Sequence, residues 1–226
     1  LSLQTARQQG IANFTILPAL KVLRPALEAL LTDDSINLDG LIAPGHLSVI
    51  TGADAFGYLP EKYGLPTVIT GFKTAEIWLG LTALARQIKA GQAKLENMYP
   101  QAVSNAGNLA AQKLIKQVFR VDDGEWRGLG VLPGSGLGFD KEYLRYDARV
   151  RFQLEPLQSV EPPGCLCGMI ILGKSEPEEC RHFGRTCRPE HPVGPCMVSS
   201  EGTCAAHFYY RDRRAREDDE DSSYLG

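Results

Sequence analysis

The segment PTVITG, Pro66–Gly71, is a short apolar run that lies between a proline and a glycine. This pattern is typical of a buried strand in a parallel sheet, because helices cover both faces of such a sheet. DGLIAP, Asp39–Pro44, has the same form, and each of the two runs is followed by a segment that can form a helix. The alternation predicts an α/β fold with a Rossmann-like parallel sheet and flanking helices.

The best-defined helix is predicted directly after PTVITG. It covers TAEIWLGLTALARQIKA, Thr74–Ala90, and Gly91 provides the stop signal. Apolar residues recur along it at helical spacing, which predicts one continuous stripe. The stripe consists of Ile77, Leu81, Leu84 and Ile88.

Other segments give weaker signals. Helices are predicted over residues 1–10, 24–31 and 108–119, the last with Asn108 as its N-cap. NFTIL, Asn13–Leu17, is expected to form a strand. WRGLGVLPGSGLGF, Trp126–Phe139, is rich in glycine and predicts tight turns rather than regular structure.

Composition excludes several classes of protein. The 226 residues carry 24 Lys and Arg against 27 Asp and Glu, a net charge of −3, which offers no basic field for nucleic acid. We find no apolar run of membrane-spanning length and no signal peptide pattern. The expected location is therefore the cytoplasm, without a membrane partner.

The chain changes character along its length. We predict an α/β domain over residues 1–120, a Gly- and Cys-rich region over 121–210 and a disordered charged tail over 211–226. The sequence that begins at Leu1 resembles the middle of a helix rather than the start of a protein. We therefore expect the first domain to be incomplete and part of the protein to lie upstream.

All the cysteines fall in the second region. They are Cys165, Cys167, Cys180, Cys187, Cys196 and Cys204. A disulfide framework is typical of small secreted chains, and a structural zinc site favours Cys-x2–4-Cys pairs, which are not found here. An iron–sulfur cluster accepts four thiolates at variable spacing, and nearby glycines and prolines allow the backbone to wrap around it. The cluster is the favoured interpretation, and the other two stay open.

Cys165 and Cys167 form a Cys-x-Cys pair. In an extended chain their side chains share a face, with α-carbons about 6.6 Å apart, close to the upper limit for a mutual disulfide. One thiol can therefore bind metal while the other lies beside the cluster and pairs with a second spare thiol. A buried, inert cysteine is the alternative.

The carboxyl ends of the two predicted strands form a second candidate site. In APGHLSVITG, Ala43–Gly52, His46 would follow a strand and start a helix, where with Ser48 it could bind an anion or a metal-bound ligand. TGFK, Thr70–Lys73, occupies the same place after the next strand. The alternative in both cases is a simple turn, with His46 capping a helix.

Taken in order, several stretches resemble the HypD family of hydrogenase maturation proteins. They are APGHLSVITG, GLPTVITGF, NAGNLAAQKL, WRGLGVLPGSGL, PPGCLCGMIILGKSEPEEC and CRPEHPVGPCMVSSEGTCAAHFYY. The similarity extends to Tyr210. It implies α/β domains with a cysteine-rich region that holds a 4Fe-4S cluster.

The resemblance also implies roles for individual residues. The cluster ligands would be Cys165, Cys180, Cys187 and Cys204. Cys167 and Cys196 would form a redox-active pair, an arrangement similar to that of ferredoxin:thioredoxin reductase. The residues of the cleft would be Pro44, Gly45, His46, Ser48, Gly71 and Phe72.

The implied function is that of a scaffold rather than a turnover enzyme. With the chaperone HypC and the cyanide donor HypE, such proteins assemble a transient iron with cyanide and carbon monoxide ligands, which passes indirectly to the large subunit of NiFe hydrogenases. A zinc- or disulfide-stabilised binding module without a redox role, as a remnant of a truncated gene, is the competing interpretation.

Two departures from the family pattern are visible. Family members bind the iron being assembled through amino-terminal cysteine motifs, and those motifs are not found in this sequence. In addition, Lys73 and Thr74 follow TGF where the family has an acidic residue and proline, and Glu76 replaces an expected Asp.

Overall fold

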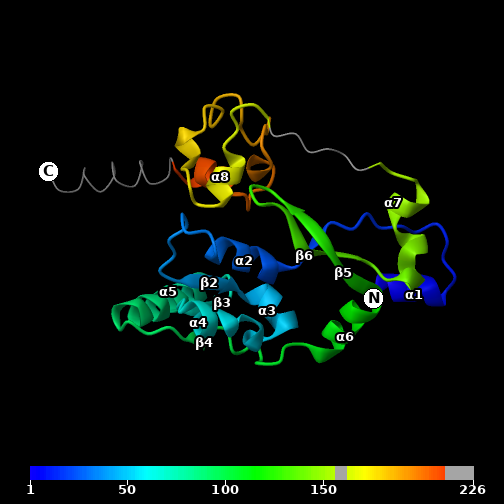
Figure 1. The fold of residues 1–226 in the computed structure, drawn as a ribbon, viewed down its shortest axis with the longest axis horizontal. Helices are drawn as coiled ribbons and strands as arrows, with labels where there is room; N and C mark the ends of the chain where they lie inside the picture. The colour runs from blue at the N-terminus through cyan, green and yellow to red at the C-terminus, as the bar shows by residue number, and fades with distance from the viewer. Residues whose placement is uncertain (156–161, 212–226) are drawn as a thin grey trace. The chain divides into compact units, whose positions relative to one another are not determined.

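The structure is a computed structural model that describes residues 1–155 and 162–211. Its α/β layer is built on a three-stranded sheet in the order β2 (Leu41–Pro44), β3 (Thr67–Thr70) and β4 (Leu95–Asn97). Both pairings are parallel, and Figure 1 labels the three strands. The predicted parallel sheet is confirmed. Every residue of β3 is buried, whereas Ile42 on the edge strand β2 is exposed.

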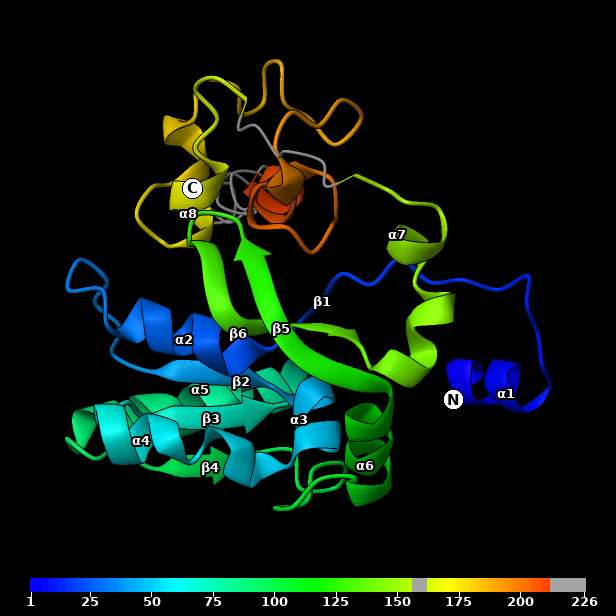
Figure 2. The same ribbon diagram turned by 45° about the vertical axis from the view of Figure 1, so that its right-hand side comes forward.

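Helix α5 (Thr74–Lys89) packs on this sheet (Figure 2). The predicted helix is confirmed, but the face that it buries differs from the predicted stripe. Its buried residues are Gly80, Ala83 and Gln87. Ile77, Leu81 and Ile88 of the stripe are 38%, 40% and 43% exposed. Small side chains allow the helix to approach β3 closely, and this closeness, rather than side-chain hydropathy, decides which face is covered.

A second sheet has the order β1 (Leu20–Lys21), β6 (Gly130–Phe139) and β5 (Phe119–Trp126). The tight turns predicted for residues 126–139 are therefore wrong, because most of that segment is the central strand of this sheet. Neighbours on both sides pair with the backbone of β6; for example, the Val22 amide donates to the Ser135 carbonyl at 2.8 Å. The Trp126 indole also donates to the Ser135 hydroxyl at 2.7 Å.

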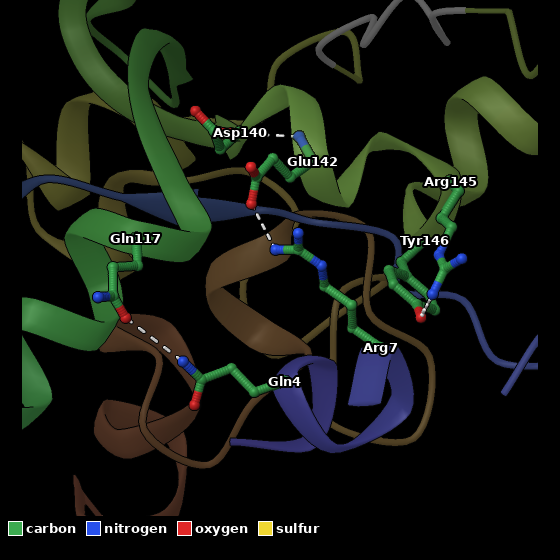
Figure 3. A network of polar contacts seen from close by, with 7 residues as sticks. All are labelled: Gln4, Arg7, Gln117, Asp140, Glu142, Arg145 and Tyr146. Carbon is green, nitrogen blue, oxygen red and sulfur yellow. Dashed lines mark hydrogen bonds and ion pairs between the residues drawn. The ribbon is translucent and has the colours of Figure 1, made fainter. Parts of the chain in front are cut away.

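The amino-terminal helix α1 (Ser2–Gln8) is held by a local apolar core and by polar contacts. Gln4 donates to Gln117 at 3.4 Å, and Arg7 pairs with Glu142, as Figure 3 shows. The strand expected over residues 13–17 does not form. Ile16 makes only an isolated bridge opposite Asp147: its amide donates to the Tyr146 carbonyl at 2.8 Å, and its carbonyl accepts from the Ala148 amide at 2.9 Å.

The remaining elements are short. The predicted helix over 24–31 is α2, and α6 begins after Asn108, whose side chain accepts from the Ala111 amide at 3.0 Å as expected of the predicted N-cap. The bounds are α2 Leu23–Leu31, α3 Gly45–Thr51, η1 Ala53–Phe56, α4 Tyr58–Tyr63, α6 Leu109–Val118, η2 Lys141–Tyr146, α7 Ala148–Arg151, α8 Cys167–Ile171, η3 Pro177–Glu179 and η4 Pro195–Met197.

The chain divides into two compact units, each made of three segments. The first contains residues 1–19, 37–121 and 137–153, and the second contains residues 20–36, 122–136 and the described residues from 154 to 211. The linear boundaries predicted at residues 120 and 210 stay predictions, and all of the predicted tail except Arg211 lies outside the described residues. Within the described part of the chain, no helix combines the length and the apolar character needed to cross a membrane.

Replacing Gly80 by Ala should destabilise the first unit. An added β-carbon would lie 2.1 Å from Cγ2 of Thr70, which is buried beneath the helix. Overpacking of this kind costs about 1–3 kcal/mol, which exceeds the gain of about 1 kcal/mol from replacing glycine within a helix. Urea unfolding should show a lower midpoint. Gly57→Ala is the matched control, because its β-carbon would meet no atom closer than 3.4 Å, and equal midpoints for the two variants would contradict the packing argument.

Candidate functional site

The six cysteines are carried by different short elements of the second unit, in the segments that run from yellow to red in Figure 1. They lie before α8 (Cys165), at its first residue (Cys167), after η3 (Cys180), in a turn bridged to Phe183 (Cys187), in η4 (Cys196) and in the helical residues 203–211 (Cys204). Five of the thiols are buried and Cys165 is half-buried. All six carry free thiols.

These thiols belong to one apolar cluster. Ile170, Met197 and Ala205 are buried with them, and Phe183, Val193 and Phe208 pack against the cluster from outside. Free cysteine behaves as a small apolar side chain, so protonated thiols can form a core together. The arrangement thus brings together every cysteine that the sequence singled out.

Sulfur contacts place Cys196 at the centre of the cluster. Its amide donates to Cys167 Sγ at 3.3 Å, and its own Sγ lies 3.0 Å from Cys204 Sγ. The Val193 amide donates to Cys187 Sγ at 3.3 Å. Cys167 and Cys196 are therefore neighbours, as the predicted pair requires, and Cys196 also contacts a predicted cluster ligand. The redox and ligand roles themselves stay predictions.

Burial changes the acidity of the thiols. It raises the pKa of Cys165 and Cys204, and it raises the pKa of Cys167 and Cys196 to about 11. The charge of Arg127 acts in the opposite direction on the pKa of Cys165 and Cys167, but more weakly than burial does. The neutral thiol is thus favoured at neutral pH, and a thiolate here needs a nearby cation.

The thiols provide the donor atoms with which this region could bind a metal group. Among the described residues, no three His, Cys, Asp or Glu side chains stand where they could hold one metal ion together. Thiolates are the ligands that iron–sulfur clusters use, so the donor atoms fit that group.

The second candidate site lies at the carboxyl edge of the parallel sheet. Pro44 ends β2 in register with Thr70 of β3, so the segments that follow the two strands are neighbours, as predicted. The His46 and Phe72 rings lie 5.3 Å apart between centroids, and both are exposed. Gly45 and Gly71 are buried beside them.

Ser48, also predicted at this edge, lies inside the fold. Its side chain is fully buried, and its hydroxyl donates to the Pro44 carbonyl at 2.9 Å. Glu76 forms a capping box at the start of α5, where it accepts from the Lys73 amide at 3.1 Å. It also accepts from Gln101 at 3.1 Å. Ser48 and Glu76 therefore fix the backbone at this edge of the sheet.

Sequence reasoning missed two polar residues that directly follow Cys180. The side chains of Arg181 and His182 both contact the Pro163 carbonyl, from a position 18 or 19 residues further along the chain. The only signal in the sequence was the run of polar residues after Cys180, and nothing local connects it with Pro163. Tertiary structure alone reveals this contact.

The fold and the thiol cluster define an α/β protein with a cysteine-rich carboxy-terminal region. A family model named HypD and described as "Hydrogenase formation hypA family" matches residues 1–211. The chain belongs to the HypD family, and the resemblance seen in the motifs is confirmed.

Individual relatives agree with this assignment. Proteins called hydrogenase maturation factor HypD from Escherichia coli and Azotobacter vinelandii are each 38% identical to the chain, over 216 and 222 residues. The protein of the same name from Rhodobacter capsulatus is 37% identical over 222 residues. These matches cover 95–96% of the chain but only 58–59% of each relative. The chain therefore spans less than two thirds of the length of these relatives.

Replacing Gly202 by Ala should disturb the thiol cluster. A β-carbon there would lie 2.2 Å from the Cys196 carbonyl oxygen, so the backbone that precedes Cys204 would have to move away from Cys196. We expect a loss of about 1–3 kcal/mol in unfolding free energy. Alkylation of Cys196 and Cys204 in the reduced protein should also become faster, as residue-resolved mass spectrometry would show.

Glu201→Ala is the control, because Glu201 is exposed and adjacent in sequence. It should change stability by less than about 0.5 kcal/mol. If both variants label at the wild-type rate, the close approach at Gly202 does not hold the two thiols together.

Proposed function

We propose that the chain acts in the maturation of NiFe hydrogenases as a redox scaffold that carries a 4Fe-4S cluster. The observation that carries the proposal is the gathering of six free thiols, five of them buried, in one apolar cluster. Membership of the HypD family supports it, since relatives are named hydrogenase maturation factors. In this role the protein is a maturation factor rather than an enzyme with turnover.

Four of the thiols would hold the cluster. They are Cys165, Cys180, Cys187 and Cys204, and they come from four separate segments of the region. Thiolate donors suit iron, and the backbone amide of Val193, which donates to Cys187 Sγ at 3.3 Å, is the kind of hydrogen bond that tunes such a cluster. A bound cluster would supply one-electron transfer.

The two remaining thiols, Cys167 and Cys196, would form the redox pair. Their oxidation to a disulfide would release two protons and would pass two electrons to the assembly of the iron ligands; the cluster would return electrons one at a time and restore the dithiol. The Cys196 amide donates to Cys167 Sγ at 3.3 Å, so the two residues are neighbours in the fold. Because Cys196 Sγ also lies 3.0 Å from Cys204 Sγ, the pair adjoins a ligand through which electrons could pass.

The wider role follows from the family. HypC and HypE would be the partners in the cytoplasm, and the cargo would be a transient iron with cyanide and carbon monoxide ligands, destined indirectly for the hydrogenase large subunit. The exposed rings of His46 and Phe72 at the carboxyl edge of β2 and β3 are the candidates for contacts with a partner or with cargo. No nucleic acid or membrane takes part in this proposal.

Two serine substitutions, two positions apart, test the division of roles. Cys165→Ser should lower the content of iron and acid-labile sulfide, because a ligand is lost, whereas Cys167→Ser should leave both near wild type. Anaerobic preparation, metal and sulfide analysis and electron paramagnetic resonance of the reduced protein provide the measurements. Each variant serves as the matched control of the other.

The same assays address the competing functions. About one equivalent of zinc without sulfide would overturn the cluster proposal in favour of a structural zinc module. A disulfide-stabilised module, favoured by the 3.0 Å contact between Cys196 and Cys204, would contain neither metal nor sulfide. Loss of iron in Cys167→Ser would show that the ligand set is wrong.

A further inference from the structure

The residues between Cys180 and Cys187 fold into a compact turn. The Phe183 amide donates to the Cys180 carbonyl at 2.9 Å, and the Cys187 amide donates to the His182 carbonyl at 2.9 Å. Phe183 and Cys187 form an isolated bridge. Backbone hydrogen bonds thus fix His182 relative to both cysteines.

Arg181 Nε lies 3.4 Å from Nε2 of the half-buried His182 ring, and two shorter contacts in opposite directions orient this ring. Its Nε2 lies 2.9 Å from the Pro163 carbonyl oxygen, and its Nδ1 lies 2.8 Å from the Thr186 hydroxyl. A carbonyl oxygen can only accept, so Nε2 carries the proton. In the neutral ring Nδ1 then accepts from the Thr186 hydroxyl, which fixes the tautomer and the orientation of the ring.

The Pro163 carbonyl belongs to the loop that carries Cys165. The Cys165 amide donates to the Pro162 carbonyl at 3.0 Å, which closes a turn around Pro163 and Gly164. Arg181 also donates to the Pro163 carbonyl, and a β-carbon on Gly164 would lie 2.1 Å from Arg181 Nε. The loop is therefore in direct contact with the segment that follows Cys180.

We propose that His182 is a positioning residue that holds the Cys165 loop in place against the Cys180–Cys187 turn. The inference rests on the proposed function, in which Cys165, Cys180 and Cys187 are three of the four cluster ligands. No helix or strand includes residues 162–166, so the position of Cys165 depends on side-chain contacts such as this one. Hydrogen bonds of this kind orient ligands and typically change metal affinity 10–100-fold.

Three substitutions separate the bond to Pro163 from the presence of the ring. His182→Ala removes both hydrogen bonds. His182→Gln places an amide donor near the position of Nε2, from which it can still donate to the Pro163 carbonyl. The shorter amide of His182→Asn reaches only the position of Nδ1 and cannot make that bond. His191→Ala is the matched control, because His191 is an exposed histidine in the same region.

The first measurement uses reduced protein without metal. Residue-resolved alkylation should show Cys165 reacting several-fold faster in His182→Ala and His182→Asn than in wild type. His182→Gln and His191→Ala should react at the wild-type rate. Circular dichroism of each variant checks that the fold is kept.

The second measurement uses anaerobically reconstituted protein. Release of iron to a chelator should be about 10–100-fold faster in His182→Ala and His182→Asn, and His182→Gln should restore most of the difference. A purely structural role for the ring would instead make all three substitutions alike. If His182→Ala does not fold, Thr186→Val takes its place and should give a smaller rise in Cys165 labelling.

The outcomes distinguish the two proposals. Wild-type labelling of Cys165 in His182→Ala, or in Thr186→Val where that variant is used, overturns the positioning role. Absence of iron and sulfide in wild type, together with faster labelling in the variants, overturns the cluster proposal and leaves the contact between His182 and the Cys165 loop supported.

Discussion

The cysteine-rich region depends on the burial of its own thiols. Apart from the helical residues 203–211, its regular elements are short: α8 has five residues, and η3 and η4 have three each. Hydrogen bonds within such elements cannot define a tertiary structure, so the core must do so. That core consists largely of cysteine side chains with Ile170, Met197 and Ala205. The side chains that pack the region are therefore the same thiols that carry its chemistry.

Burial also determines what the thiols can do. It raises the pKa of Cys167 and Cys196 to about 11, which keeps them protonated unless a cation stabilises the thiolate. A core of neutral thiols is stable as apolar packing, and a core of thiolates needs metal. The same residues can thus serve as packing and as ligands, and the contacts of Gly202 and His182 hold their backbone in place in either case.

The α/β layer is stabilised in a different way from the cysteine-rich region. Strand β3 is covered on both faces, and α5 approaches it through Gly80 and Ala83. The parallel pairing places the ends of β2 and β3 side by side, with His46 and Phe72 exposed there. Backbone hydrogen bonds define this sheet, whereas side-chain packing defines the thiol region.

The sequence by itself determined the elements whose signals are local. The strands β2 and β3, the helix α5, the N-cap at Asn108 and the grouping of the cysteines could all be predicted, because each depends on residues close together in the chain. Family membership was also visible in the motifs.

Only the tertiary structure decided the rest. The buried face of α5 was set by close contact with Thr70, and the glycine-rich segment became β6 because strands paired with it on both sides. The contact between His182 and Pro163 joins residues 19 positions apart. These three features depend on groups that are distant in the chain and compete for the same space and the same hydrogen bonds. A local sequence pattern does not contain that information.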